Sequence, residues 1–348
     1  MKLNVKLLLP PEPSLTAEFS VEGRFSWAVL DAGGAVVQEG EQRNLITDNG
    51  LDYLMVGGMQ HAHMYVCVGV GNRPPAFTDT RLDSEVYRYG NLETTSNSES
   101  GGGFIGPGEY RSFRRWLFPL GSVEANLAEV GFSHMGGFNS GVNIRQLFRD
   151  AQGQPQVVSV ARDQQLRIRH ELFYRFPRTL TAMEWPIEGL GTQRPDGTWE
   201  PLKGRGGFLS LQDGVDSWTP QYQYSSGEKQ PQAGGDLLLG MLSTAPQPAA
   251  ASYAMPYISG YAGGAHTVGT FTPEPYAPGS FERVKTVEIG PDAYNRDFNF
   301  IGYGLRDSYY SDAQPHWGFF FDQPLKATKL DTHRLRLSIK WRLAREAT

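Results

Sequence analysis

Residues 165–176 read QLRIRHELFYRF, and this stretch decides the fold class because its apolar and charged residues alternate. The residues expected on one side of an extended chain are Leu166, Ile168, Leu172, Tyr174 and Phe176, and those on the other are Gln165, Arg167, Arg169, Glu171 and Arg175. A helix would scatter both sets around its circumference. The stretch therefore predicts a long β-strand with one buried face and one solvent-exposed face, as in antiparallel sheets.

The same alternation of apolar and charged residues occurs near the end of the chain, where residues 334–343 read RLRLSIKWRL. The inward set is Leu335, Leu337, Ile339, Trp341 and Leu343, and the outward set is Arg334, Arg336, Lys340 and Arg342. A second long strand of the same type is predicted there.

Other landmarks also recur. LTAEFSVEG at 15–23 and LTAMEWPIEG at 180–189 share six identities once one inserted residue is allowed. Val68-Gly69 matches Leu239-Gly240 and Val130-Gly131 matches Ile301-Gly302, both 171 residues apart. Solenoid repeats have units of about 20 to 50 residues, so this long period predicts a tandem duplication of a whole domain. The alternative is that two β-rich segments share apolar-Gly-apolar landmarks by chance.

Length and composition agree with two domains. The chain has 348 residues, 41 of them glycine and 23 proline, and only 20% are charged. At about 100 to 200 residues per domain, this predicts an all-β protein of two tandem, similar antiparallel β-sandwich domains. The first is placed at residues 1–177 and the second, with longer loops, at 178–348.

Local patterns add elements to this outline. The further strands are predicted at 17–30, 35–43, 64–70, 111–118, 125–132, 281–289 and 297–303. TDNGLDYLMVG predicts one short helix, with Thr47 or Asp48 as its cap and Gly57 at its end. Long Gly- and Pro-rich loops are predicted at 90–109, 222–235 and 243–280.

Charge and hydropathy exclude several classes. A net charge of −5 gives no general attraction to nucleic acid, and no apolar run approaches the roughly 20 residues that a membrane-spanning helix needs. The three consecutive leucines near the start are too few for a signal peptide, so a soluble, unprocessed chain is expected. Cys67 is the only cysteine, which excludes an internal disulfide, and MYVCVGV predicts that it is buried as a small apolar residue.

Motifs for metal or phosphate chemistry are weak. His61 and His63 in QHAHM would share one side of a strand, but a third metal ligand is missing nearby. HELFY at 170–174 lacks the second histidine of a zinc-protease helix. GVGNRPP ends in two prolines where a dinucleotide-binding helix must begin, and KGRGG at 203–207 lacks phosphate-loop spacing. We expect no catalytic, cofactor-binding or metal residues, and no cofactor.

For three groups of side chains, the sequence allows both a functional and a structural interpretation. Glu129, Asp150 and Asp163 are the candidate acids for glycoside hydrolysis, against roles in a strand and in turns. Arg111, Arg114 and Arg115 form a basic patch that in an acidic chain is expected to pair with carboxylates or a protein partner. The aromatic runs YSDAQPHWGFFF and YAMPYISGY either stack on sugars or belong to the core and to interfaces.

An ordered set of motifs then brings a family resemblance. NLITDNGLDYL at 44–54 is followed by VCVGVG, PPAFTDTRL at 74–82, ANLAEVGF at 125–132, LFRD and DQQLRIRHELFYRF. Residues 40–176 in this order resemble structural proteins of tailed bacteriophages, of the tail, baseplate or tail-fibre-attachment type. The second half lacks NLITD and has APQPAAAS in place of PPAFTDT. From the residues themselves, Gly69 and Gly71 are expected where backbones approach closely, and Asp79 and Thr80 where turns need hydrogen bonds.

The resemblance implies a non-enzymatic virion protein of the tail region, made in the host cytoplasm. Its expected partners are other tail or baseplate proteins and further copies of itself, as a trimer or hexamer. Two similar domains per chain would let three chains offer six similar surfaces to a six-fold ring. The alternatives are a receptor- or carbohydrate-binding tail module that recognises a host-surface glycan, and a tail-spike glycan hydrolase. A tail-spike hydrolase built on a β-helix would show many short sequence repeats, and this sequence has none, which argues against the hydrolase.

Overall fold

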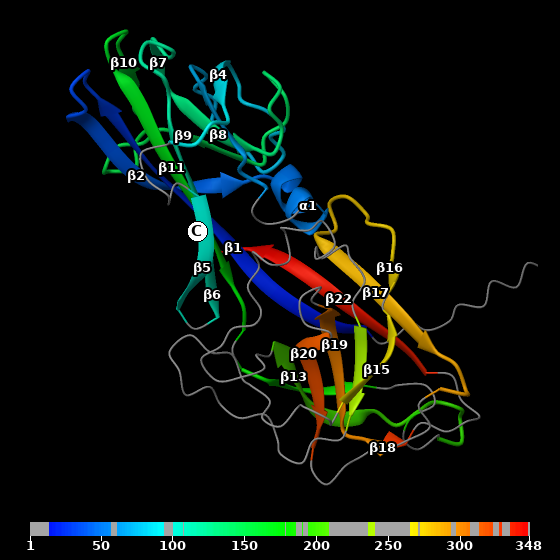
Figure 1. The fold of residues 1–348 in the computed structure, drawn as a ribbon. Helices are drawn as coiled ribbons and strands as arrows, with labels where there is room; N and C mark the ends of the chain where they lie inside the picture. The colour runs from blue at the N-terminus through cyan, green and yellow to red at the C-terminus, as the bar shows by residue number, and fades with distance from the viewer. Residues whose placement is uncertain are drawn as a thin grey trace, which may run out of the picture.

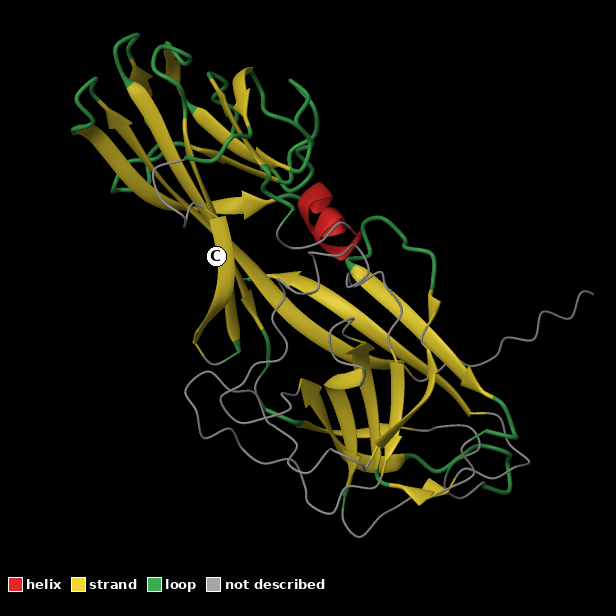
Figure 2. Ribbon diagram, viewed as in Figure 1, coloured by secondary structure: helices red, strands yellow, loops and turns green. Residues whose placement is uncertain are grey.

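The computed structural model shows an all-β protein with one short helix among its described residues (Figure 2). The structure describes residues 14–56, 61–93, 100–106, 108–177, 179–185, 190, 194–208, 236–240, 265–270, 272–293, 297–306, 313–322, 327–328 and 335–346. We refer to residues 1–177 as the first half and to residues 178–348 as the second half.

The elements of the first half are β1 (Ser14–Leu30), β2 (Val36–Ile46), α1 (Asp48–Val56), β3 (Tyr65–Gly69), β4 (Glu85–Tyr89), β5 (Ser100–Gly106), β6 (Glu109–Leu117), β7 (Ala125–Leu127), β8 (Glu129–Ser133), β9 (Ile144–Leu147), β10 (Val158–Val160) and β11 (Gln165–Arg175). Those of the second half are β12 (Thr181–Trp185), β13 (Leu202–Phe208), β14 (Asp236–Gly240), β15 (Ala265–Thr270), β16 (Thr272–Pro273), β17 (Glu282–Ile289), β18 (Asp297–Phe298), β19 (Phe300–Arg306), β20 (Ala313–Phe321), β21 (Ala327–Thr328) and β22 (Leu335–Arg345).

The two alternating stretches form the strands that the sequence predicts. The predicted inward residues of β11 are buried, as is Phe176 directly after the strand, and Arg167 to Arg175 pair with β1 on one side and with β6 on the other. β22 buries its predicted set as well. The other predicted strands are confirmed, although 125–132 divides into β7 and β8 and 297–303 into β18 and β19.

Two loop predictions need correction. Within 90–109, residues 100–106 form β5, which pairs with β6 despite three consecutive glycines, because backbone pairing needs no side chain. Within 243–280, residues 265–270 form β15, which pairs with β14. The prediction for 222–235 and the part of the last prediction that covers 243–264 lie outside the described residues.

Both halves contain six strands in a corresponding antiparallel order. In the first half the order is β1-β2-β9-β8-β3-β4, and in the second it is β12-β13-β20-β19-β14-β15. Val68 pairs with Val130 across β3 and β8, and Leu239 pairs with Ile301 across β14 and β19. The three-strand orders β5-β6-β11 and β16-β17-β22 correspond as well.

A continuous sheet of twelve strands crosses from one half into the other. Ser14–Val21 of β1 pairs in parallel with β22, while the rest of β1 pairs antiparallel with β2 and β11. In Figure 1, β1 runs through both groups of strands. This parallel pair departs from the all-antiparallel expectation, and the division of the chain at residue 177 stays a prediction.

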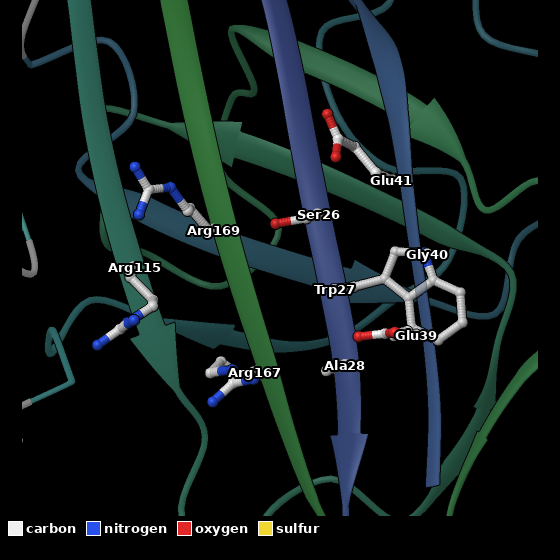
Figure 3. Close-up of a pocket in the computed structure, with 9 residues that line it drawn as sticks. All are labelled: Ser26, Trp27, Ala28, Glu39, Gly40, Glu41, Arg115, Arg167 and Arg169. Atoms are coloured by element: carbon white, nitrogen blue, oxygen red, sulfur yellow. The ribbon is translucent and has the colours of Figure 1, made fainter. Parts of the chain in front are cut away.

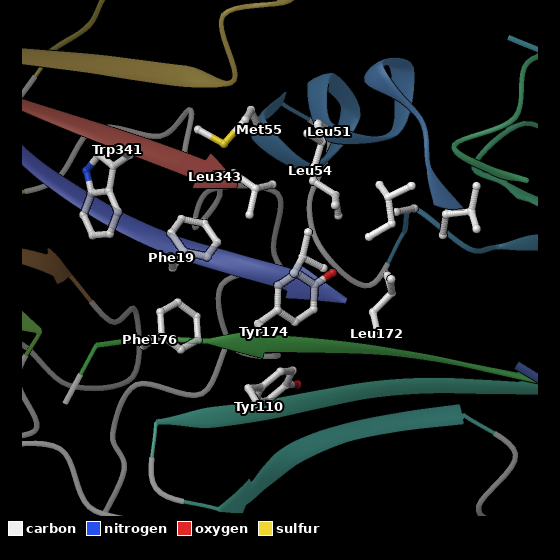
Figure 4. Packing of buried hydrophobic residues seen from close by; sticks show 14 of the residues in the cluster. Phe19, Leu51, Leu54, Met55, Tyr110, Leu172, Tyr174, Phe176, Trp341 and Leu343 are labelled. Carbon is white, nitrogen blue, oxygen red and sulfur yellow. The ribbon is translucent and has the colours of Figure 1, made fainter. Parts of the chain in front are cut away.

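The core follows the same path. One cluster of buried apolar side chains runs from the first half into the second. Phe19 stacks on Phe176 at 5.1 Å between ring centroids, Phe176 meets Phe208 at 5.4 Å, and Phe208 meets Trp341 at 5.7 Å. Figure 4 shows Phe19, Phe176 and Trp341 of this chain of rings, beneath the helix residues Leu51, Leu54 and Met55.

Candidate functional site

A buried ionic cluster joins Asp79, Glu129 and Arg145 in the first half. Arg145 on β9 donates to Glu129 on β8 from Nε at 3.0 Å and approaches it with Nη2 at 2.9 Å. Its Nη1 donates to Asp79 at 2.5 Å, and Nη2 also donates to the carbonyl of Arg73 at 2.9 Å. Arg145 and Glu129 have no solvent exposure, so their charges are balanced inside the protein rather than by water.

Glu129 also holds the loop that precedes β4. Its two carboxylate oxygens accept the backbone N–H groups of Gly71 at 3.2 Å, Asp83 at 3.0 Å and Ser84 at 2.7 Å. A Cβ at Gly71 would lie 2.5 Å from this carboxylate, which explains the glycine and confirms the predicted close approach. Glu129 is therefore a structural anchor, because its oxygens are occupied by donors and closed to a substrate.

Asp79 plays the same part within PPAFTDTRL. Its carboxylate accepts the Ala76 N–H at 2.8 Å and pairs with Arg73 at 2.9 Å, which confirms a turn-forming role for this aspartate. Burial alone would raise the pKa of Asp79. The hydrogen bonds from Ala76, Arg145 and Arg73 outweigh burial and hold that pKa below its usual range.

The start of α1 is fixed by a neighbouring hydrogen-bond cluster. Thr47 is the cap, because its Oγ1 accepts the Gly50 N–H at 3.1 Å. Thr47 Oγ1 and N both donate to the Asn143 carbonyl at 3.0 Å, and Asn143 Nδ2 donates to Ala62 at 2.7 Å. NLITD thus forms a helix cap that is attached to the loop before β9.

The helix also contacts the second half. Arg345 of β22 donates from Nε to the Ile46 carbonyl at 2.8 Å, pairs with Asp48, and lies over the Phe77 ring at 4.2 Å. Tyr276 donates its hydroxyl to Asp52. α1 is therefore a contact point between the two halves (Figure 1).

An open, charged groove lies on the outer face of the first-half sheet. It has a volume of about 470 Å³ and is lined mainly by Ser26 and Ala28 of β1, Glu39 and Glu41 of β2, Arg167 and Arg169 of β11, and Arg115 of β6. Figure 3 shows the arginines on one side and the glutamates on the other, with the two small residues between them.

Sheet register sets this charge pattern. Ser26 pairs with Glu41 on one side and Arg169 on the other, so these three residues form one row across the sheet. Ala28 with Glu39 and Arg167 forms the next row. The charged walls lie two strand spacings apart, or about 10 Å. The space between them is open because the side chains of Ser26 and Ala28 are too short to fill it. In the described part of the chain, no ion pair joins Arg167 to either glutamate, whereas Arg169 pairs with Glu171 of its own strand at 2.8 Å.

The candidate metal histidines lie in a turn, not a strand. His61 is half-buried, and His63 is fully buried, with Nδ1 at 2.7 Å from Nδ1 of His170 and Nε2 at 3.0 Å from Ser112 Oγ. Burial lowers the pKa values of both buried histidines well below 6.5, with repulsion between the rings adding to the effect on His63. We assign the pair to the core, because both rings are closed to solvent.

The candidate acids form no carboxylate pair open to a substrate. Glu129 is in the ionic cluster, Asp150 accepts the backbone N–H groups of Gln152 and Gln154 in a turn, and Asp163 is exposed before β11. Cys67 is buried as predicted, and burial raises the pKa of its thiol.

The predicted basic patch divides between two environments. Arg111 pairs with Glu171 at 3.4 Å and Arg115 with Glu93 at 2.6 Å, so the expected pairing with carboxylates is confirmed for these two. Arg114 is half-buried, and burial lowers its pKa.

Several buried polar groups were not predicted from the sequence. Two of them could have been found from the alternation of their strands, because a polar residue at an inward position has to be buried. His170 and Lys285 occupy inward positions of otherwise alternating strands. Burial and the nearby Arg283 lower the pKa of Lys285 to about 7. By contrast, nothing in NIRQLF marks Arg145 as the centre of an ionic cluster.

The remaining motifs have structural roles. HELFY lies in β11, KGRGG lies in β13, and GVGNRPP forms the end of β3 and the start of the loop that follows it. Trp317, Phe319, Phe320 and Phe321 of the first aromatic run are buried, which agrees with the core interpretation. YAMPYISGY lies outside the described residues.

No group of three potential metal-ligating side chains occurs in the described ranges. Within those ranges, too, no helix has the length and apolar character needed to cross a membrane. Comparisons of the chain with protein-family models, curated proteins and solved structures found no match.

Proposed function

We propose that the chain is a non-enzymatic structural component of a bacteriophage particle, a tail or baseplate adaptor or fibre-attachment protein that assembles in a symmetric ring. One observation carries the proposal. The motifs that resemble tail proteins converge on the ionic cluster of Glu129, Arg145 and Asp79 and on the adjacent cap of α1. Their charged and polar groups are used in folding, as expected of a motif set that specifies a scaffold.

The proposal includes a tandem duplication of a β-rich unit. It is supported by the corresponding six-strand orders of the two halves and by the pairs Val68 with Val130 and Leu239 with Ile301. These four residues belong to the landmarks that recur 171 positions apart in the sequence. Two units of one design per chain would give a ring twice as many similar surfaces as chains.

The duplicated units differ in how their last strands pair. β11 pairs antiparallel with β1 of its own half, whereas β22 pairs in parallel with β1 of the other half. A chain built this way holds its two units together through one strand and through the contacts of α1. That connection suits an adaptor, which must keep two binding surfaces at a fixed separation.

Quantitative mass spectrometry of gradient-purified particles tests the proposal. We expect the chain at a fixed copy number, a multiple of three, relative to the major tail and capsid proteins. Absence from the particle would overturn the proposal. A trace amount that varies between preparations would also overturn it, because a structural part has fixed stoichiometry.

The second candidate is a module that binds a host-surface glycan, and the charged groove favours it. Its arginine and glutamate side chains supply donors and acceptors of the kind that sugar hydroxyls and carboxylates use. A glycan array separates the candidates. Specific binding that is lost on changing Arg167 to alanine would favour the module, and no binding would favour the adaptor.

A further inference from the structure

We propose that the charged groove is a self-association face, and that its occupant is the same groove of a second copy of this chain. The inference goes beyond the proposed function, because it concerns the purified chain in solution and needs no phage particle. It rests on the position of each charge in the sheet rather than on the number of charges.

The two rows of the groove have the same polarity. Glu41, Ser26 and Arg169 form one row, and Glu39, Ala28 and Arg167 form the other, with the glutamates always on β2 and the arginines always on β11. Alternate residues of a strand are about 6.8 Å apart, so each wall carries its two charges at the same spacing.

A two-fold axis parallel to β1 and above Ser26 and Ala28 exchanges the walls. The axis places the arginine wall of one copy opposite the glutamate wall of the other, as an isologous interface requires. Because each row keeps its position along the axis, Arg169 faces Glu41 of the second copy while it also pairs with Glu171 of its own strand at 2.8 Å, and Arg167 faces Glu39. Two rows counted from both copies give four ion pairs.

The next row along the strands follows the same rule with reversed sign. Arg43 of β2 and Glu171 of β11 flank Arg24 of β1, so the axis brings Arg43 opposite Glu171 of the second copy. Within one chain, Arg43 pairs with Glu22 at 3.0 Å and Glu171 pairs with Arg169 at 2.8 Å, so this row adds to existing ion pairs. Arg24 lies on the axis, where it would meet its own copy. Arg24 pairs with Glu22, whose carboxylate is 2.7 Å from Arg24 Nε and also pairs with Arg43 and Arg175.

The width of the groove also fits this occupant. Sheets that pack face to face lie about 10 Å apart, and the axis brings the small residues Ser26 and Ala28 of the two copies opposite each other, so the long side chains of the walls can meet on both sides of them. A simple anion satisfies the arginines but meets Glu39 and Glu41 opposite, and a simple cation meets the reverse conflict. A second copy satisfies both walls with the correct spacing.

Sedimentation of the full-length chain over a range of concentrations tests the inference. We expect a dimer at about 0.05 M salt that weakens at about 0.5 M, because the contacts are ionic. The double variants Glu39→Arg with Glu41→Arg, and Arg167→Glu with Arg169→Glu, give two walls of one sign. Each should be a monomer alone, with a dimer Kd weakened about 100-fold or more.

Mixing the two double variants is the decisive step. One has only arginine walls and the other only glutamate walls, so an equimolar mixture should form a heterodimer. Combining all four changes in one chain reverses both walls and should restore a homodimer. These restorations distinguish pairing between copies from a general effect of net charge.

Matched variants outside the groove serve as controls. Glu124→Arg with Glu288→Arg, and Arg162→Glu with Arg336→Glu, make the same changes in charge at exposed positions and should dimerise like the wild type. Circular dichroism confirms that every variant is folded. A wild type that is monomeric at both salt concentrations overturns the inference, whether or not it binds an acidic oligosaccharide. Double variants that stay monomeric when mixed also overturn it.

Discussion

Replacing Arg145 with methionine removes the cation that balances two buried carboxylates. Arg145 contacts Glu129 through two nitrogens at 2.9 and 3.0 Å and Asp79 at 2.5 Å, and its side chain is fully buried. Methionine fills most of the volume but donates no hydrogen bond. Removing one member of a buried ion pair costs about 3 to 5 kcal/mol, because a buried charge, here that of Glu129, loses its balancing cation.

Urea denaturation followed by tryptophan fluorescence measures this loss as a change in the free energy of unfolding. Arg162→Met is the matched control, since Arg162 is exposed in a turn and its loss should stay within about 0.5 kcal/mol. In a double-mutant cycle, Arg145→Met combined with Glu129→Gln should cost about 0.5 to 3 kcal/mol less than the sum of the single changes. An Arg145→Met variant as stable as the Arg162→Met control would refute the role of the cluster.

Three further predictions follow from buried groups. Burial holds the pKa values of His63 and His170 below 6.5, so the unfolded state takes up protons first as the pH falls. The stabilising effect of this difference should be full above about pH 6.5. Below that pH the free energy of unfolding should fall by up to about 1.4 kcal/mol per pH unit for each histidine. Urea midpoints at pH 7.5 and 5.5 measure this, and equal midpoints for the wild type would contradict it. Gly50→Ala should lower the thermal midpoint, because its Cβ would lie 2.0 Å from the Asn143 carbonyl oxygen, whereas an unchanged midpoint would mean that the helix start moves freely. The buried Cys67 thiol, with its raised pKa, should resist a thiol reagent in the native protein and react in urea; rapid native labelling would place it at the surface.

Much of the secondary structure was predictable because the signals are local. The alternation in β11 and β22 needs only the period of an extended chain, and the cap of α1 needs only Thr47 before an apolar turn. β5 was missed because its glycines resemble a loop, although glycine pairs through its backbone like any other residue.

The candidate sites were less predictable, since they depend on which distant segments meet. The parallel pairing of β1 with β22 joins residues more than 300 positions apart and leaves no local pattern. The groove arises only when β2, β1 and β11 are in register, although Arg167 and Arg169 were correctly expected to face outward. His170 and Lys285 were predictable in principle, because a polar residue at an inward position of a strand has to be buried.

An electron cryomicroscopy reconstruction of the particle tests the proposed adaptor role most directly. We expect density for this chain in the tail region, with three or six copies per ring and the two halves of each chain in pseudo-equivalent positions. A tail without this density, or a copy number unrelated to three or six, would contradict the account of the chain as a duplicated ring component.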